Sequence, residues 1–416
     1  MPHPRVPHLE VDLSDRARFR QGMPWETLEE IRSGAALWWH PPTEGTREIL
    51  ETGFYVVPRH ADLVAVSRDP ERFSSRDGTG LRKMAEVPSI SSLDPPEQTR
   101  WRRLIGRSFT PGTVRRLEER MQEWTDAILE DVLPRGECDF VQQVSHLLPL
   151  HVIADIVGIP TEERAEVFAR VNDMVRHEDP DQALPEGTFE DAKAKLARYA
   201  WGLTRKRRAA PNDDVWSHLI RAELELEDGS RTAFDDDELG IWFMTLAIAG
   251  SETTRNVLAV GLEALIRHPE QLKRLREDPT LMPLAVEEIL RWSSPVLYQR
   301  RTTTCEVEIA GHPVEAGMPV MLMWPAGNRD PEAFDDPWRF DITRNPNEHV
   351  AFGGGGPHFC LGANLARKEM SVMLGAVVER MDEIELAGPS RWTTPGIATP
   401  VAVGIDELPI RFKMRP

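Results

Sequence analysis

Four consecutive glycines at positions 353 to 356 are followed by a histidine and a cysteine two residues apart, His358 and Cys360. Glycine has no side chain, so such a run is expected where the backbone must come close to another group. Cys360 stands at the start of a helical pattern that continues to Met381. Unpaired N–H groups and the positive end of the helix dipole stabilise a thiolate at such a place, and thiolates bind metal ions. The string therefore predicts a metal ligand at Cys360.

This string has two other interpretations. A lone cysteine is most often an inert buried side chain. A glycine-rich loop can also bind phosphate, but no Lys-Ser/Thr pair follows here, and Pro357 removes one of the N–H donors that a phosphate would need. The complete string favours the metal ligand over both.

Helical patterns dominate the chain, and short β-like pieces lie between Arg300 and Met323. The longest helix is expected from Asp235 to Ile266, where acidic residues in the first turn suit the positive end of the helix dipole. There is no internal repeat and no low-complexity linker. We therefore predict a mainly α fold with a smaller β region. It forms one compact domain over residues 1–416, with a short flexible N-terminal segment of about 20 residues.

Charge and cysteine usage exclude several classes of protein. The 416 residues carry 50 Lys and Arg against 68 Asp and Glu, a formal net charge of −18, which disfavours binding to nucleic acid or to an anionic membrane. The three cysteines form no C-x-x-C pair and no regularly spaced framework, which excludes a disulfide-stabilised scaffold and a zinc ribbon. The N-terminal residues lack an apolar signal-peptide core, and the longest apolar stretch, Ile241 to Gly250, is too short to cross a bilayer. We expect a cytoplasmic protein without a membrane span.

The expected long helix carries a face without bulky side chains. Thr245, Ala249 and Thr253 recur every four residues, and Gly250 lies among them. Such a face is typical of close helix packing. It is equally typical of a groove in which a small ligand and ordered water lie over a cofactor, and serine and threonine there can bond back to the helix backbone and loosen it. The spacing alone leaves both interpretations open.

Together, Phe352, the glycines, His358, Cys360 and Gly362 resemble the haem-ligand loop of the cytochrome P450 monooxygenases. Three further landmarks of that family occur in the expected order, so the resemblance covers essentially the whole chain. Between Phe352 and Cys360 the loop has one residue more than the commonest form in the family. This longer form resembles that of a bacterial subgroup acting on sterols and methyl-branched lipids. The resemblance implies the cytochrome P450 fold, haem b (iron protoporphyrin IX) as cofactor and Cys360 as the iron ligand.

The resemblance also assigns other cofactor contacts. The segment from Asp94 to Arg102 resembles the helix whose basic residues hold a haem propionate, and Arg102 is the residue expected to do so. Gln98 stands where many relatives carry histidine, and no contact is assigned to it. The residues implied to contact the cofactor are Arg102, Ala249, Arg301, His358, Phe352, Cys360 and Gly362.

Two more landmarks have roles in the family. Glu252 and Thr253 resemble the acid–alcohol pair that delivers protons to dioxygen. Glu288 and Arg291, three residues apart on one helix, would be a surface pair if taken alone. In the family this pair is buried and is completed by an arginine from a later loop, and the segment from Pro337 to Phe340 implies Arg339 as that third member.

By family position, the substrate pocket is expected to be apolar, which suits a lipophilic ligand. Its expected members are Leu81, Met84, Val87, Ile90, Ile248, Val296, Leu297 and Ile397. The predicted function is hydroxylation of a steroid, terpenoid or branched lipid. A tailoring hydroxylase of a secondary metabolite, a peroxide-driven oxygenase and a non-catalytic haem-binding sensor are the alternatives. The last two do not require the Glu252–Thr253 pair.

A basic segment suggests an electron donor. Residues 100–120 contain seven arginines against Glu118 and Glu119, a local charge of +5 in an acidic chain. A solvated helix face is one explanation. The other is a docking surface for an acidic, ferredoxin-type donor that works with its own reductase, since complementary charge speeds encounter.

Overall fold

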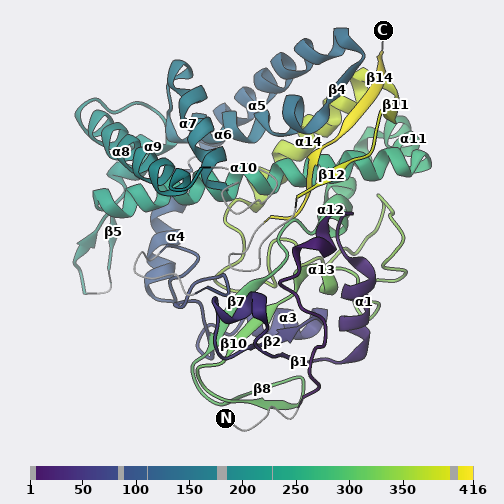
Figure 1. The fold of residues 1–416 in the computed structure, drawn as a ribbon. Helices are drawn as coiled ribbons and strands as arrows, with labels where there is room; N and C mark the ends of the chain where they lie inside the picture. The colour runs from purple at the N-terminus through teal and green to yellow at the C-terminus, as the bar shows by residue number, and fades with distance from the viewer. Residues whose placement is uncertain are drawn as a thin grey trace.

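The computed structural model describes residues 6–82, 89–109, 111–175, 185–226, 228–393 and 402–415. Within these residues the chain divides into a helical half and a smaller β-rich half that contains the N-terminal region (Figure 1). The predicted mainly α fold with a smaller β region is confirmed.

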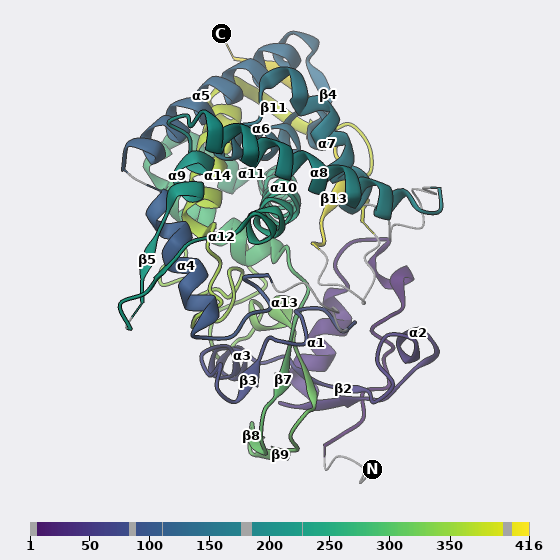
Figure 2. The ribbon, with the colours of Figure 1, turned by 90° about the vertical axis from the view of Figure 1, so that its left-hand side faces the viewer.

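The helical half is arranged around α10 (Asp236–Arg267), which crosses the middle of the molecule and is seen end-on in Figure 2. Its helices are α4 (Glu97–Ser108), α5 (Pro111–Val132), α6 (Leu147–Val157), α7 (Thr161–Val175), α8 (Thr188–Ala209), α9 (Val215–Arg221), α11 (Pro269–Glu277), α12 (Met282–Ser293) and α14 (Ala363–Arg380). Shorter turns are η2 (Leu133–Arg135), the π-helical η3 (Val141–Ser145) and η5 (Pro279–Leu281).

The predicted start of the long helix is explained by its cap. The side chain of Asp235 accepts a hydrogen bond from the N–H of Glu238, and the side chain of Glu238 accepts one from the N–H of Asp235. This reciprocal arrangement satisfies two donors that have no partner within the helix. The acidic first turn then fixes where α10 begins.

The β-rich half is built on a five-stranded sheet in the order β1-β2-β10-β7-β3, in which only β2 and β10 run parallel. Its strands are β1 (Trp38–His40), β2 (Phe54–Val57), β3 (Phe73–Ser74), β7 (Gln299–Thr303) and β10 (Pro319–Leu322). Around it lie η1 (Arg16–Phe19), α1 (Trp25–Gly34), α2 (Glu44–Arg47), α3 (His60–Ser67), α13 (Trp324–Gly327) and the hairpin of β8 (Val307–Ile309) and β9 (His312–Val314).

The remaining strands form a three-stranded sheet in the order β11-β14-β4 and two small pairs. These strands are β4 (Glu137–Asp139), β5 (Leu224–Glu225), β6 (Arg231–Thr232), β11 (Met381–Leu386), β12 (Arg391–Trp392), β13 (Ile405–Glu407) and β14 (Pro409–Met414). The three-stranded sheet therefore joins the end of the chain to the segment that follows α5.

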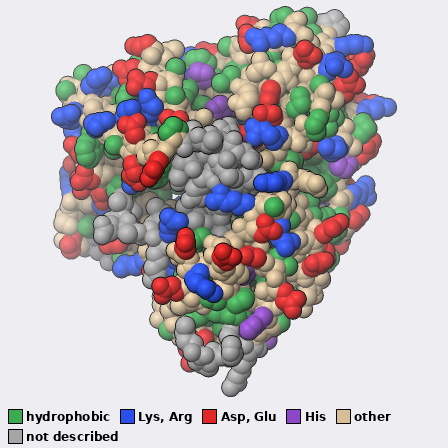
Figure 3. Space-filling model, viewed as in Figure 1, with side chains coloured by type: hydrophobic (Ala, Val, Ile, Leu, Met, Phe, Trp, Pro, Cys, Tyr) green, Lys and Arg blue, Asp and Glu red, His purple; other side chains and the backbone are tan. Residues whose placement is uncertain are grey.

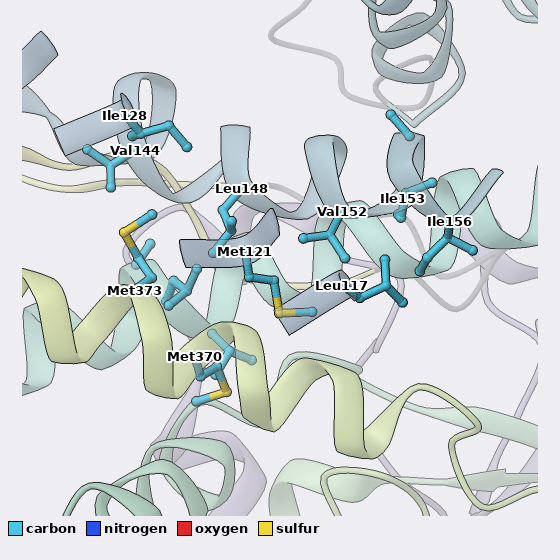
Figure 4. Packing of buried hydrophobic residues seen from close by; sticks show 14 of the residues in the cluster. Leu117, Met121, Ile128, Val144, Leu148, Val152, Ile153, Ile156, Met370 and Met373 are labelled. Carbon is cyan, nitrogen blue, oxygen red and sulfur yellow. The ribbon is translucent and has the colours of Figure 1, made fainter. Parts of the chain in front are cut away.

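The largest hydrophobic cluster lies between α5, α6, α10 and α14. Figure 4 shows how Leu117 and Met121 of α5 face Leu148 and Val152 of α6, with Met370 of α14 below them. Burying these apolar side chains is the main driving force that holds the helices together. Two smaller clusters lie on the two faces of the five-stranded sheet.

Two expectations from the sequence, a flexible N-terminal segment and the absence of a membrane-spanning helix, can be compared with the structure. From residue 6 onward, the segment expected to be flexible is packed, with Val6, Leu9 and Phe19 buried against the β-rich half. Within the described residues no single helix is long and apolar enough to span a bilayer; one sharply bent pair, Val141–Val157 with Thr161–Met174, meets the length and composition criteria together. Acidic and basic side chains are mixed over the face drawn in Figure 3.

Candidate functional site

The glycine run is packed against the end of α3. A Cβ atom on Gly354 would lie 2.9 Å from the Cα of Val64, and one on Gly356, whose φ is +72°, would lie 2.6 Å from the carbonyl oxygen of Ser67. Arg68 donates from Nε to the carbonyl oxygen of Gly354 at 3.2 Å. The close approach expected from the sequence is therefore, at these two glycines, an approach to another part of the protein.

Cys360 follows this run and precedes α14, which begins at Ala363 rather than at Cys360. Its N–H donates to the carbonyl oxygen of Phe352 at 3.0 Å, and its side chain is exposed. Protein atoms crowd the thiol on its other sides, and this burial raises the pKa of Cys360, although the N–H of Gly362 and the charge of Arg102 act in the opposite direction. The thiol is therefore the expected form in the protein alone, and a bound cation would favour the thiolate.

Arg102 lies near this thiol, and both Arg102 and Arg301 lie near His358. Arg301 is buried on β7, and burial lowers its pKa to about 10, partly offset by Asp94. The pKa of His358 is lowered to about 3 by burial and by the nearby charges of Arg301 and Arg102. His358 is therefore uncharged near neutral pH, and the positive charges beside it are the guanidinium groups of Arg301 and Arg102.

The donor set fits an iron porphyrin. Among the described residues, the hydrogen bond of the buried Arg301 guanidinium goes from Nη1 to the carbonyl oxygen of Arg300 at 2.8 Å. A buried cation with so few partners is stabilised by an anionic ligand that bonds to it. A group with anionic arms and a metal ion that accepts a thiolate satisfies both Arg301 and Cys360.

Helix α4 supports the same loop through contacts that were not predicted. Gln98 donates from Nε2 to the carbonyl oxygen of Pro357, and Arg102 donates from Nη1 to that of Phe359 at 2.8 Å. Gln98 therefore holds the loop directly. The sequence signal was its position, four residues before Arg102 on one helix face.

The small residues of α10 pack against a neighbouring helix on one side and are exposed on another. Thr253 donates to the carbonyl oxygen of Ala249 at 2.9 Å, and Ser251 donates to that of Ala247 at 2.7 Å, as expected for hydroxyls that bond back to a helix. A Cβ on Gly250 would lie 2.5 Å from Cδ1 of Ile153, so this glycine allows close packing with α6.

On the side of α10 that does not pack against α6, Ala249 is exposed. Ile248 is exposed there too, with 37 % of its surface accessible. Apolar residues in the middle of a helix that crosses the molecule are usually covered. This side of α10 is therefore open to a ligand, as the second interpretation of the spacing requires.

Glu252, the expected partner of Thr253, forms an ion pair with Arg255 instead. Its Oε2 atom lies 2.7 Å from Nη2 of Arg255, one helical turn further along α10. Within the described chain, the structure gives no hydrogen bond between Glu252 and Thr253. The two residues predicted as an acid–alcohol pair are thus neighbours in sequence with different partners.

The predicted Glu288–Arg291 pair is fully buried, and Arg291 donates from Nε and Nη2 to the two carboxylate oxygens at 2.8 and 2.7 Å. The assignment of Arg339 as the third member is wrong. The side chain of Arg339 is 62 % exposed and lies near Asp341, whereas Arg344 donates from Nε to Oε2 of Glu288 at 3.2 Å. At position 339 the chain turns its carbonyl oxygen, not its side chain, toward Arg291.

The expected pocket residues occupy different environments. Leu81, Ile90 and Leu297 are buried, Val296 is half-buried, and Ile248 is exposed. Leu297 lines a small cavity with Phe19, Leu28, Met321 and Met323. Met84, Val87 and Ile397 lie outside the described residues.

The basic segment contains both paired and unpaired arginines. Arg100 is paired with Glu238, Arg116 with Asp213 and Arg120 with Asp155. Arg103 and Arg115 are exposed and make no ion pair with a described residue.

The comparisons with known proteins agree with this fold. The family model described as Cytochrome P450 matches residues 55–387. The methyl-branched lipid omega-hydroxylase of Mycobacterium bovis is 35 % identical over 431 residues, covering 99 % of this chain and 96 % of that protein. The steroid C26-monooxygenase of Rhodococcus jostii is 32 % identical over 412 residues, covering 97 % of this chain and 84 % of that protein.

Among solved structures, the Mycobacterium marinum cytochrome P450 CYP268A2 in complex with pseudoionone superposes with a TM-score of 0.86. It is 33 % identical in sequence, and the match covers 98 % of this chain and 99 % of that one. A mainly helical fold with a cysteine loop of this kind defines a haem-thiolate protein. The chain belongs to the cytochrome P450 family.

Several predictions made from the sequence are thereby confirmed. The protein is a monooxygenase that uses protoporphyrin IX haem, O2 and a redox partner to hydroxylate a lipophilic substrate. A haem bound through a thiolate supplies the oxidising power, because the sulfur ligand pushes electron density onto iron and favours O–O cleavage; the handling of substrate and protons is left to the protein.

Proposed function

We propose that Cys360 is the haem ligand of a hydroxylase acting on steroids, terpenoids or methyl-branched lipids. The observation that carries this assignment is the exposed Cys360 thiol close to Arg102, together with the buried Arg301 near His358, whose guanidinium has few partners among the described residues. The anionic propionates would lie against Arg301, His358 and Arg102, with Phe352, Gly362 and Ala249 completing the cofactor surroundings. A Cβ on Gly362 would meet no described atom within 4 Å, which leaves room for a bound group.

The proposed substrate class has two supports. The side of α10 that carries Ala249 and the exposed Ile248 is small and apolar, which suits a ligand held mostly by burial of apolar surface. The relatives named above are a steroid C26-monooxygenase and a methyl-branched lipid omega-hydroxylase, and the similar structure holds pseudoionone. Leu81, Ile90, Val296 and Leu297 remain proposed pocket residues.

Glu252 and Thr253 are proposed to supply protons on this side of the haem. Thr253 carries a hydroxyl next to the exposed Ala249, and its hydrogen bond to the backbone can be exchanged for one to a ligand or water. Glu252 is an ionisable group adjacent to it in the chain. General acids placed in this way typically accelerate proton-dependent steps by about 10²–10⁴-fold.

The electron donor is proposed to be an acidic, ferredoxin-type protein in the cytoplasm. Arg103 and Arg115 are exposed and lack ion pairs with described residues, and Phe359 and Leu361 beside Cys360 are exposed apolar side chains. A surface that combines unpaired positive charge with an apolar centre suits a partner of opposite charge.

The deciding experiment is the absorption spectrum of reduced, carbon monoxide-treated protein. A red-shifted, thiolate-type band is expected for the wild type, and Cys360→Ala should abolish it. Cys305→Ala is the matched control, because Cys305 is also an exposed free cysteine but lies on the turn after β7. A histidine-type band in the wild type would refute the assignment. A spectral-shift screen over sterols, terpenoids and branched fatty acids then tests the substrate class.

A further inference from the structure

The carboxylate of Glu252 is held by a buried ion pair within its own helix. The side chains of Glu252 and Arg255 are only 10 % and 2 % exposed, and 2.7 Å separates Oε2 from Nη2. Charged side chains are rarely buried unless they are paired, and removing one partner leaves the other buried and uncompensated. Arg255 is therefore the group that fixes where the Glu252 carboxylate lies.

Arg255 also belongs to a small polar site. Its Nε donates to Oδ1 of the neighbouring Asn256 at 3.1 Å, which orients the Asn256 amide. The Nη1 atom of Arg255 and the Nδ2 atom of Asn256 are buried and have no hydrogen-bond partner within the described residues. Leaving such donors without a partner is costly, and buried donors of this kind are usually satisfied by ordered water.

The backbone near Gly404 covers one side of this site. A Cβ on Gly404 would lie 2.4 Å from both Cβ and Cγ of Asn256, so the segment before β13 packs directly on the amide. Asn256 itself is fully buried. The amide has little room on the side of Gly404, and its Oδ1 is held by Arg255.

We propose that Arg255 is the positioning residue for Glu252, and that Arg255 Nη1 and Asn256 Nδ2 bind ordered water that adjoins the ion pair. This inference rests on the proposed proton-supplying role of Glu252. The ion pair with Arg255 holds the Glu252 carboxylate away from Thr253 until the carboxylate is protonated. The bound water lies on the inner side of α10, away from the exposed Ala249. This water relays a proton: as it gives one to the Glu252 carboxylate, it takes another from hydronium in the solvent, so the water is left unchanged and the carboxylate gains one proton.

The first test is structural and does not depend on activity. A crystal structure of the haem-loaded enzyme should show ordered water within hydrogen-bond distance of Arg255 Nη1 and Asn256 Nδ2. Asn256→Ser, which removes the amide donor and leaves the ion pair, should displace that water. Density that shows both nitrogens bonded to protein atoms and no water would overturn the proposal.

The second test separates positioning from folding. Arg255→Gln should keep the thiolate-type spectrum, while product formed per electron pair falls by about tenfold or more and the solvent isotope effect on turnover changes. Arg255→Lys, which keeps the charge, should recover most of the loss. Arg267→Gln is the matched control, because Arg267 pairs with Glu263 on the same helix but is 58 % exposed.

The outcomes distinguish this inference from the proposed function. If Arg255→Gln lowers only the melting temperature, with coupling and isotope effect as in the wild type, Arg255 has no positioning role. If Arg255→Gln does not fold, Asn256→Ser decides: it should lower the product formed per electron pair, and wild-type coupling in this variant would overturn the inference. A wild-type spectrum without a thiolate band would instead refute Cys360 as the ligand, whatever Arg255 does.

Discussion

Arg344 completes the coordination of Glu288, with 3.2 Å between Nε and Oε2. The same carboxylate accepts hydrogen bonds from Arg291, from the N–H of Asp341 at 2.9 Å and from Nδ2 of Asn347 at 3.1 Å. A carboxylate removed from water needs such a complete set of donors. Helix α12 is thereby attached to the loop of residues 339–347, which leads into the cysteine loop.

This geometry makes opposite predictions for two arginines in that loop. Arg344→Ala removes a nearly buried partner of Glu288 and should destabilise the protein by about 3 kcal/mol, with loss of haem. Arg339→Ala removes an exposed group whose ion pair with Asp341 spans 3.7 Å, and should cost less than about 1 kcal/mol. Thermal unfolding and the haem content of the purified variants measure both effects. Equal losses in the two variants would contradict the assignment of Arg344.

The contact between the glycine run and α3 predicts a steric effect. In Gly354→Ala the new Cβ would lie 2.9 Å from the Cα of Val64 and 3.0 Å from the carbonyl oxygen of Leu63, and backbone atoms of a helix cannot easily move. Such overpacking typically costs about 1–3 kcal/mol. We expect a smaller fraction of thiolate-type spectrum, because the strain falls on the loop that carries Cys360.

Gly375→Ala provides the control for that substitution. The nearest atom to its Cβ would be Cε of Met282, at 4.0 Å, and the residue lies within α14. Alanine should stabilise this helix by about 0.5–1 kcal/mol and leave the spectrum unchanged. A normal spectrum and unchanged stability in Gly354→Ala would show that the loop is not confined by α3.

A buried carboxyl group in α14 predicts a pH-dependent stability. Glu369 is buried, its Oε2 has no partner among the described residues, and burial raises its pKa to about 8. Between about pH 4.5 and 8 the unfolded chain therefore releases a proton that the folded chain keeps, and folding becomes less favourable as the pH rises. Glu369→Gln removes this loss.

The variant should be more stable than the wild type by about 3 kcal/mol near pH 7.5, and the difference should shrink toward pH 4.5. In a chain of this length that corresponds to a melting temperature higher by on the order of 3 °C. Glu379→Gln, an exposed position on the same helix, should show no such trend. A constant difference at all pH values would mean that Glu369 is ionised in the folded protein.

Charge reversal at the unpaired arginines tests the docking surface. Arg103→Glu with Arg115→Glu should slow reduction by an acidic ferredoxin about tenfold or more at low ionic strength, and the difference should narrow as salt is added. Lys273→Glu on α11, a 75 % exposed position, changes the net charge in the same direction and should have little effect. Stopped-flow reduction rates measure both. Identical rates and salt dependence would exclude the surface.

Most of the architecture followed from local patterns. The acidic cap at Asp235 and the apolar periodicity located α10, and the glycine–cysteine string located the loop, because both depend on residues close together in the sequence. The pairing of Glu288 with Arg291 was visible for the same reason, since three residues separate them on one helix face.

What could not be predicted depends on long-range contacts. Arg344 and Arg339 are both arginines in one turn-rich loop, and only the folded backbone decides which side chain turns inward. The contact of Gly354 with α3 joins residues about 290 positions apart, and no local pattern reports it. Glu252 and Arg255 have the same three-residue spacing as Glu288 and Arg291, but the burial of their side chains depends on the packing around α10, which the spacing does not report.

The attachment of the glycine run to α3 has a consequence for biosynthesis. The loop around Cys360 rests on residues 64–68 and on Gln98 and Arg102 of α4, so its supports are translated long before the cysteine. These supports in α3 and α4 are thus available early in synthesis, whereas Cys360, the proposed haem ligand, is added when nearly nine-tenths of the chain has been made. The loop that carries Cys360 can therefore dock on its supports only when synthesis of the chain is nearly finished.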